Sequence, residues 1–431
     1  MRIERREWDG SQATLLAGEL RAAAAPPSEL ARGVAEIITQ VAERGDEALA
    51  ELTARFDATE RPPESLRVPA EEAEAALSGL DSELRAALEL AAENVRAVAA
   101  AEADRGEAAV ELPQGQRVRV VRRPVDAAGI YAPGGRAAYP SSVLMCCLPA
   151  AVAGVGRIVL CTPPDERGRV HPVVLAAAAL AGVGEIYAVG GAQAIAALAL
   201  GTETIAPVDV IAGPGNAWVA EAKRQLYGRV GIDAIAGPSE LVVVAGPGCE
   251  PREAALDLLA QAEHGEESPL FAIAWERELL ARLEAEVGEL APARPSVSDA
   301  RLTLVLAPDR ESALALADAI APEHLELRFE GADAELAAQR VAGCVFFGAA
   351  AGTAFGDYAA GSNHVLPTGG AARFAGPLGP GAFMRRASVV EIPAEAARAL
   401  APTVDRIARE EGLPVHGESA RAAAADRQGR G

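Results

Sequence analysis

The feature that most constrains the fold of this chain is a repeated alternation of short apolar runs with alanine-rich helical segments between residues 127 and 236. Short apolar runs that end at glycine or proline are typical of buried strands, and the segments between them have the length of helices. Repeated β-α-β units place their strands in one parallel sheet. This part of the sequence therefore predicts an α/β domain with an incomplete Rossmann-like parallel sheet.

A second alternation of the same kind runs from residue 232 to residue 348. It begins with two expected strands, GIDAIAG (231–237) and ELVVVAG (240–246). The second alternation predicts another αβ domain, into which the first one is inserted. Helical extensions are expected at both ends of the chain.

The segments around the two alternations set the expected domain boundaries. Apolar residues recur at helical spacing from residue 28 to residue 103, and a strand pair is expected around Gln114–Gly115. The expected parts are an N-terminal arm of residues 1–20, one αβ domain of residues 21–126 and 236–385, an inserted αβ domain of residues 127–235, and a C-terminal helical tail of residues 386–431.

Glycine-rich turns follow three of the strands expected in the inserted domain, at residues 133–135, 190–191 and 213–215. Each turn opens a helix, and a helix N-terminus can accept a pyrophosphate. None of the three turns matches the G-x-G-x-x-G fingerprint of dinucleotide sites. A nucleotide site and ordinary turns between strand and helix therefore both remain open.

A possible metal site lies at the end of the helical run 252–262. Gln261 and His264 are three residues apart, so a carbonyl oxygen and an imidazole share one face. Two ligands do not hold a metal, and a single histidine near a helix end is usually a surface residue. However, four of the five histidines follow residue 260. Imidazole is common in zinc sites and in proton transfer, so chemistry and chance clustering both remain open.

Composition excludes several classes of partner. The 431 residues carry a net charge of −21, which argues against binding to nucleic acid or an anionic membrane. The five cysteines show no C-x-x-C spacing and are expected to be reduced thiols.

The charged start of the chain and the absence of a long apolar run predict a cytoplasmic protein. The one lysine, Lys223, marks either a place that requires a compact ammonium group or chance.

Two further segments carry polar residues at informative places. Glu323 and His324 follow Pro322, which disfavours helix before it, so this pair is expected on a turn. By itself the pair also fits a solvated surface. The segment from residue 349 to residue 383 has no convincing periodicity. A loop of this length in a compact enzyme is more often functional than idle.

Several long motifs in this sequence closely resemble those of the histidinol dehydrogenases. They span nearly the whole chain and stand in the order of the family. The motifs are YAPGGRAAYPSSVLM, VGGAQAIAALALGT, GPGNAWVAEAKRQLYG, IDAIAGPSEL, AQAEHG, PEHLEL, FGDYAAGSNHVLPTGG and EEGLPVHGESA.

The resemblance implies a zinc-dependent oxidation of L-histidinol to L-histidine through bound L-histidinal, with reduction of two NAD+ and one Zn2+ per subunit. It makes residues 127–235 the NAD-binding domain and residues 21–126 and 236–385 the domain for substrate and metal. The implied zinc ligands are Gln261, His264, Asp357 and His416. The implied NAD site contains Tyr131, Gln193 and Asn216. The implied substrate contacts are Ser239, Gln261, His264, His324, Asp357, Glu411 and His416.

Glu323 and His324 are the implied catalytic pair. Removing hydride from an alcohol requires a base for the hydroxyl proton, and a second oxidation requires water to add to the aldehyde. We expect His324, as a neutral imidazole, to serve the first step and Glu323 the second. Asn363 and His364 are expected to hold the loop in which they lie.

The resemblance also implies a homodimer in which Glu411 and His416 of the tail complete the site of the partner. Three other functions remain open. A relative on the same scaffold could oxidise another polyol, amino-alcohol or sulfo-alcohol. A zinc hydrolase would use Asp357 and His264 without any redox step. The third alternative is a binding module without catalysis.

Overall fold

The computed structural model describes residues 1–22, 29–57, 60, 65–103, 106, 108–134, 137–348, 350 and 352–425. The chain divides into two compact units. The first contains Met1–Ala103 and Val125–Phe383, and the second contains Asp104–Pro124 and Met384–Gly431. The first unit holds two parallel sheets flanked by helices, which confirms the expected α/β class.

One sheet of the first unit is built from the segment that was expected to form the inserted domain. Its parallel strands are β5 (Ala127–Tyr131), β6 (Arg157–Thr162), β7 (Glu185–Ala188), β8 (Val210–Ala212) and β9 (Gly231–Ile232). They lie in the order β7-β6-β5-β8-β9, with the short antiparallel strand β2 (Arg67–Val68) at the edge. This is the doubly wound order, whose switch point lies between β5 and β8.

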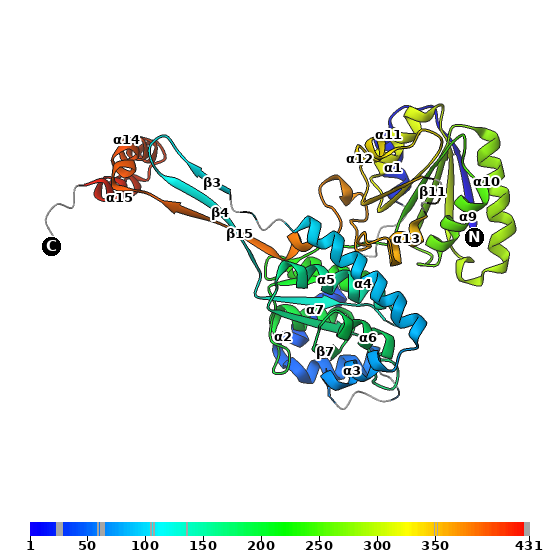
Figure 1. Cartoon of the computed structure of the whole chain (residues 1–431), viewed down its shortest axis with the longest axis horizontal. Helices are drawn as coiled ribbons and strands as arrows, with labels where there is room; N and C mark the ends of the chain where they lie inside the picture. The colour runs from blue at the N-terminus through cyan, green and yellow to red at the C-terminus, as the bar shows by residue number, and fades with distance from the viewer. Residues whose placement is uncertain are drawn as a thin grey trace. The chain divides into compact units, whose positions relative to one another are not determined.

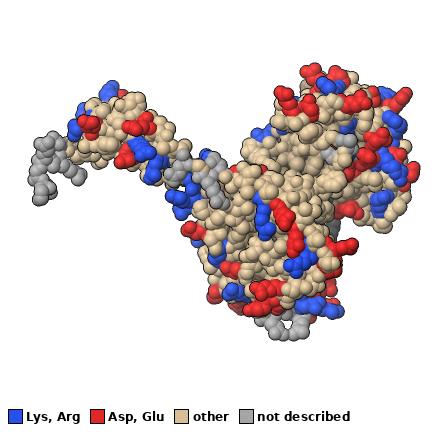
Figure 2. Space-filling view, viewed as in Figure 1, with Lys and Arg blue, Asp and Glu red and all other residues tan. Residues whose placement is uncertain are grey.

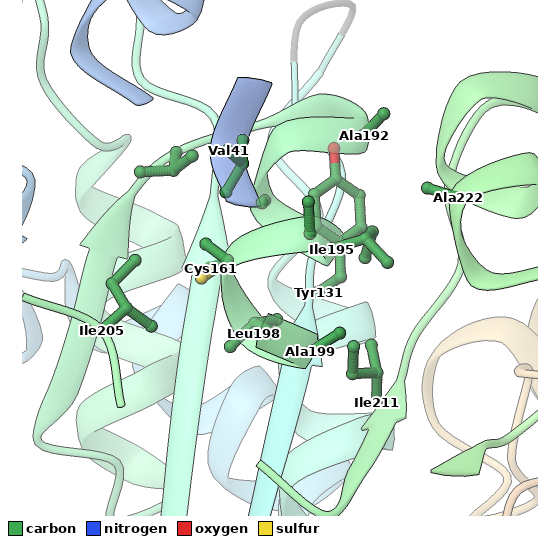
Figure 3. Close-up of a cluster of buried hydrophobic side chains, with 14 of the residues drawn as sticks. Val41, Tyr131, Cys161, Ala192, Ile195, Leu198, Ala199, Ile205, Ile211 and Ala222 are labelled. Atoms are coloured by element: carbon green, nitrogen blue, oxygen red, sulfur yellow. The ribbon is translucent and has the colours of Figure 1, made fainter. Parts of the chain in front are cut away.

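Helices cover both faces of this sheet. On one face α2 (Glu29–Phe56), α7 (Gly191–Leu200) and α8 (Ala217–Leu226) share a buried apolar cluster with the strands. Figure 3 shows Ile195 and Leu198 of α7 in this cluster, beside Tyr131. On the other face lie α5 (Pro140–Ala153) and α6 (Pro172–Leu180), which α3 (Ala70–Ser78) and α4 (Ser82–Glu102) contact from outside.

Helix α2 therefore packs on the sheet of β5, and α3 and α4 pack against helices of the same sheet, whereas the sequence placed these helices with the other domain. The difference arises because helical periodicity shows only that α2 has an apolar stripe, here with Val34, Val41 and Leu49 buried. Periodicity does not show which sheet covers that stripe.

The second sheet of the first unit is wholly parallel. Its strands are β1 (Arg2–Glu7), β10 (Leu241–Ala245), β11 (Pro269–Ala274), β12 (Arg301–Leu306), β13 (His324–Arg328) and β14 (Cys344–Phe347). They lie in the order β1-β12-β11-β10-β13-β14. Residues 1–20, expected as an arm, instead supply the edge strand β1 and most of α1 (Ala13–Ala22).

Helices α9 (Pro251–Ala262) and α10 (Arg277–Leu290) pack on one face of this sheet. Helices α1, α11 (Arg310–Ile320) and α12 (Ala334–Ala338) pack on the other, as Figure 1 shows. The segment after β14 contains the short helix α13 (Thr353–Tyr358). Short 3-10 helices lie at Ala291–Ala293, Pro295–Val297, Ala371–Arg373 and Pro380–Phe383.

The strand expected at residues 231–237 was predicted too long. Only Gly231 and Ile232 pair in the sheet, as β9. The side chain of Asp233 bonds to Lys223 and to the backbone of Gly213, and the chain then leaves the sheet before β10.

The second unit is a three-stranded antiparallel sheet followed by two helices (Figure 1). The sheet contains β3 (Ala108–Glu111), β4 (Arg117–Pro124) and β15 (Met384–Glu391), and the helices are α14 (Ala394–Glu410) and α15 (Pro414–Ala424). The expected strand pair is confirmed as β3 and β4. Residues 386–391, expected in a helical tail, instead pair with β4.

None of the helices within the described residues is both long and apolar enough to span a membrane. All five cysteines are free thiols, and four of them are buried.

Candidate active site

The sheet of β10 places three of the expected site residues, Ser239, Glu323 and His324, at the amino ends of two neighbouring strands. Ser239 lies just before β10, and His324 is the first residue of β13, paired in register with Leu241. Gln261 lies in the last turn of α9, with His264 in the turn that follows. Ligands of open α/β sheets usually bind at the carboxyl ends of strands, so topology alone does not predict this position.

His324 is buried, with 3% of its surface exposed, and its ring lies between two carboxylates. Its Nε2 is 3.6 Å from Asp357 Oδ1, and its Nδ1 is 3.5 Å from Glu323 Oε2. Burial favours the neutral ring, but the charge of Glu323 and the bonds to both carboxylates raise the pKa of His324 well above its ordinary value. This direction differs from the neutral imidazole that was expected.

The backbone at Glu323 also differs from the expected turn. The chain only bends at this residue and then enters strand β13. Its Oε2 accepts hydrogen bonds from the hydroxyl of Ser239 at 2.5 Å and from the backbone N–H of Glu240 at 2.8 Å. Both donors precede β10, so the carboxylate of Glu323 is held against the neighbouring strand.

Ser239 links the acid-base pair to Gln261. Gln261 Nε2 donates to Ser239 Oγ at 2.6 Å, and the same hydroxyl donates to Glu323. Because Nε2 of Gln261 makes this bond, the oxygen of the same amide, Oε1, is left for another partner. Of the two amide atoms, only this oxygen can bind a metal ion.

Asp357 lies on α13, beside His324. Its burial favours the neutral acid, but the hydrogen bond and charge of His324, with smaller effects of His364 and His264, lower its pKa below the ordinary value. Asp357 is therefore held as a carboxylate close to the exposed imidazole of His264. In the described part of the chain, no three histidine, cysteine, aspartate or glutamate side chains form a metal-binding group.

Helix α13 is attached to β13 by a buried polar network. The N–H and hydroxyl of Thr353 donate to Glu326 Oε1, at 3.1 and 2.7 Å. The other oxygen of Glu326 accepts from Arg328 Nε at 2.6 Å, and Arg328 also pairs with Asp257 of α9. Thr353 lies one helical turn before Asp357, and Glu326 lies two residues after His324 on the same face of the strand. The network therefore places Asp357 opposite His324.

The loop after α13 is held as expected. His364 Nδ1 is 2.8 Å from the backbone oxygen of Asp357, and its Nε2 is 3.3 Å from the hydroxyl of Ser142. Asn363 donates to the backbone oxygen of Met145 at 2.6 Å. Because Ser142 and Met145 lie on α5, these bonds connect the loop to the other sheet of the same unit.

A cavity of about 1470 Å³ lies at the carboxyl ends of β5, β6 and β7. Tyr131, Gln193 and Asn216, the three residues of the expected NAD site, all line it. The hydroxyl of Tyr131 accepts a hydrogen bond from the N–H of Gly191 and points toward the start of α7 (Figure 3). The structure thus brings residues from two of the glycine-rich turns, those at 133–135 and 190–191, to one cavity. The sequence alone left open whether these turns bind a nucleotide.

One carboxylate of this cavity was missed by the sequence analysis. Asp57, just after α2, accepts hydrogen bonds from Gln193 Nε2 at 3.2 Å and from the N–H of Gly190. Burial raises the pKa of Asp57 to about 6, although both hydrogen bonds oppose the shift. No local motif marks Asp57, because its partners lie more than a hundred residues away in the chain.

Two expected site residues lie in the second unit. Glu411 directly follows the last residue of α14 and His416 lies in the first turn of α15, and both are exposed. The other expected zinc and substrate ligands all belong to the first unit.

Comparisons with known proteins agree over nearly the whole length of the chain. The family model of histidinol dehydrogenase matches residues 21–423. The histidinol dehydrogenase of Rhodospirillum rubrum is 47% identical over 416 residues, which cover 94% of each chain. That of Cereibacter sphaeroides is 46% identical over 397 residues, covering 90% of this chain and 91% of the relative.

A solved structure agrees in the same way. The crystal structure of histidinol dehydrogenase from Elizabethkingia anophelis has a TM-score of 0.89 and 32% identity, covering 97% of each chain. The resemblance seen in the sequence is therefore confirmed, and the chain belongs to the histidinol dehydrogenase family, whose members are oxidoreductases of histidine biosynthesis.

Proposed function

We propose that this protein oxidises L-histidinol to L-histidine through bound L-histidinal, using Zn2+ and two NAD+. The observation that carries the proposal is a single hydrogen-bonded chain at one end of a sheet. It runs from Gln261 through Ser239 to Glu323, and His324 lies between Glu323 and Asp357. A pair of acid-base groups thus adjoins the oxygen donors of a metal site.

The residues present fit a zinc ion. Gln261 offers a carbonyl oxygen, Asp357 an ionised carboxylate and His264 an exposed imidazole. Zinc in catalytic sites commonly takes three protein ligands of nitrogen and oxygen type and leaves a position open. We propose His416 of the partner subunit as a further ligand. When bound, Zn2+ supplies a positive charge that orients the nitrogen atoms of the substrate, and NAD+ accepts the hydride.

In the alcohol step, the neutral form of His324, which arises when the ring has released its own proton, accepts the proton of the substrate hydroxyl. The carboxylates of Glu323 and Asp357 on either side stabilise the imidazolium that forms. In the aldehyde step, Glu323 accepts the proton of the attacking water. Ser239 and the backbone of Glu240 hold this carboxylate in place during both steps.

The cavity beside Tyr131 supports the proposal of a dinucleotide. Its volume is large enough for a small-molecule cofactor, and it lies beside the switch point of a doubly wound sheet. Helix α7 begins at its wall, at Gly191, so the positive end of the helix dipole favours a phosphate there.

The second unit supports a homodimer. Several of its large apolar side chains are exposed, which is unusual for a surface that meets only water. They are Val110, Leu112, Val389, Val390, Ile392, Val404, Ile407, Leu413 and Val415. The net charge of −21, with acidic and basic side chains interspersed over the face in Figure 2, supports the prediction that no nucleic acid is bound. The cytoplasmic location stays a prediction.

The test separates the two steps by single-turnover NADH formation from histidinol and from supplied histidinal. His324→Asn is expected to slow both steps, and Glu323→Gln mainly the aldehyde step, by about a hundredfold or more. Glu263→Gln is a matched control, because this exposed carboxylate lies beside His264 but bonds to Ser296. Equal losses on both substrates in Glu323→Gln contradict the division of labour. Absence of NADH formation from both substrates by the wild-type protein contradicts the proposed function.

A further inference from the structure

The one lysine of the chain lies in a buried ion pair behind the turn that leads to Asn216. Lys223, on α8, is 1% exposed. Its Nζ donates to Asp233 Oδ1 and to the backbone oxygen of Gly213, both at 2.6 Å. The other oxygen of Asp233 accepts a hydrogen bond from the N–H of Gly213 at 2.8 Å. One ion pair therefore holds both backbone groups of a single glycine.

Gly213 is held equally closely on its other side. Its φ of +121° is a backbone conformation that residues other than glycine rarely adopt, and a Cβ there would lie 2.0 Å from the backbone oxygen of Tyr131. Tyr131 ends β5, the neighbour of β8 in the sheet. Gly213 is thus fixed between the end of β5 and the Lys223–Asp233 pair.

The turn that begins at Gly213 leads directly to Asn216. The side chain of Asn216 caps α8 by accepting hydrogen bonds from the N–H groups of Trp218 and Val219. Asn216 and Trp218 both line the cavity, as does Tyr131. Any shift of Gly213 therefore moves one wall of the cavity.

The chemistry of the site requires lysine rather than arginine. A side chain on a helix leans toward the helix N-terminus, so Lys223 reaches back to the turn that precedes its own helix. A compact ammonium group fits between two acceptors in a space that leaves the side chain 2% exposed. The planar fork of arginine is wider and carries five donors. This accounts for a lysine in a chain whose other basic residues are arginine.

We propose that the Lys223–Asp233 pair is a positioning device for the dinucleotide, which sets the turn from Gly213 to Asn216 in the shape that binds it. The inference rests on the proposed use of NAD+. Buried ion pairs contribute little net stability compared with apolar groups of similar size, but loss of one partner leaves a costly unpaired charge. Stability and cofactor binding can therefore be separated by the choice of variant.

The experiment compares Lys223→Met with the double variant Lys223→Met/Asp233→Asn in the purified full-length protein. Three quantities are measured, namely the Kd for NADH by calorimetry, the KM values for NAD+ and histidinol, and the Tm. The single variant is expected to lose Tm and to weaken NADH binding about tenfold or more, with the histidinol KM unchanged. The double variant contains no unpaired charge, so its Tm is expected to recover while the Kd stays raised.

A control ion pair, less buried than Lys223–Asp233, lies in the same sheet. Arg157 and Glu185 pair at 2.7 Å at the amino ends of β6 and β7, away from the carboxyl ends where the cavity lies. Arg157→Met/Glu185→Gln is expected to leave the Kd for NADH unchanged.

The proposal is overturned if the Kd recovers together with the Tm in the double variant, or if Lys223→Met binds NADH as the wild type does. If Lys223→Met does not fold, the double variant decides alone. If the wild-type protein neither binds NADH nor reduces NAD+, the proposed function fails first, which is a distinguishable result.

Discussion

At the scale of single residues, the site depends on hydrogen bonds that fix the orientation of side chains. Ser239 is the clearest case, because its hydroxyl accepts from Gln261 and donates to Glu323. One hydroxyl thereby fixes which atom of the amide is free for a metal and where the carboxylate lies. The sequence placed Ser239 among the substrate contacts, which stays a prediction, but gave no sign of this bridging position.

Asp57 leads to a prediction about pH. Burial raises its pKa to about 6 in the folded protein, against about 4 in an unfolded chain. Because the folded state binds the proton more tightly, the stability that Asp57 contributes is present below pH 4 and is lost as pH rises to 6. Asp57→Asn cannot ionise and does not lose this stability. Between pH 4 and pH 6, the free energy of unfolding of the variant is therefore expected to rise relative to that of the wild type, by up to about 2 kcal/mol.

The measurement is denaturant unfolding of both proteins at a series of pH values from 4 to 7. Asp165→Asn is the control from the same cavity, since hydrogen bonds from Arg169 and Arg167 lower the pKa of the exposed Asp165 despite some burial. Its difference from the wild type is expected to stay constant above pH 4. A constant difference for Asp57→Asn as well is the result that contradicts the raised pKa.

At the scale of elements, β13 shows where sequence patterns stop being informative. His324, Glu326 and Arg328 alternate with leucines, a pattern typical of a strand with one face in water. Yet all five residues are buried, because the polar face bonds to α9 and α13. Helix α13 itself has six residues, too few for an apolar period to show.

The core of the fold was predictable, because its strands and helices are long and apolar enough to show in the sequence. The strands β5, β6, β10 and β11 are short apolar runs, and the helices that follow β5 and β10 each begin at a proline, so the order of these elements determines two parallel sheets. Periodicity carries no information about pairing over long distances. The contact of β1 with β12 and that of α2 with α7 therefore could not be predicted.

Helix α13 leads to a prediction about metal binding. Glu326 holds Thr353 at the start of this helix, and Asp357 lies one turn later. Glu326→Gln keeps the size of the side chain, but its amide has only one oxygen and cannot accept from both Thr353 and Arg328. One of the two bonds that connect α13, β13 and Arg328 is therefore lost. Residues that support a metal ligand in this way typically contribute about 10-fold to 100-fold to metal affinity. We therefore expect Glu326→Gln to release zinc to a chromogenic chelator at a correspondingly lower chelator concentration.

The control is Asp318→Asn on α11, at the other face of the sheet. Asp318 is also a partly buried carboxylate that bonds to a backbone N–H and to an arginine, namely Val341 and Arg340. This variant is expected to hold zinc as the wild type does. NADH binding should be unchanged in both variants, which shows that the fold is intact. Equal zinc affinity in Glu326→Gln and the wild type rules out a role for Glu326 in placing Asp357.

At the scale of the whole molecule, the expected ligands divide between two compact units. Gln261, His264 and Asp357 belong to the first unit, whereas Glu411 and His416 belong to the second. The second unit combines a three-stranded sheet and two helices with many exposed apolar side chains, including Val390 at 52% and Ile407 at 53% exposure. A surface of this kind favours burial against another subunit. The proposed dimer therefore accounts for both the surface and the position of the tail ligands.

Trans-complementation tests whether the tail completes the site of the partner. Co-expression of His416→Ala and Gln261→Ala chains with different tags yields mixed dimers. If the tails are exchanged, one site of each mixed dimer receives both intact residues and the other receives neither. Random pairing makes half of the dimers mixed, so the unfractionated protein should regain roughly a quarter of wild-type activity.

The choice of partners supplies an internal control. A mixture of His416→Ala and Glu411→Ala carries both changes on the tail, so every exchanged tail delivers one defect and no intact site forms. Recovery in the first mixture without recovery in the second is therefore expected only if the tail serves the other subunit. If mixed dimers isolated by both tags are as inactive as the single variants, the tail of each chain does not complete the site of its partner.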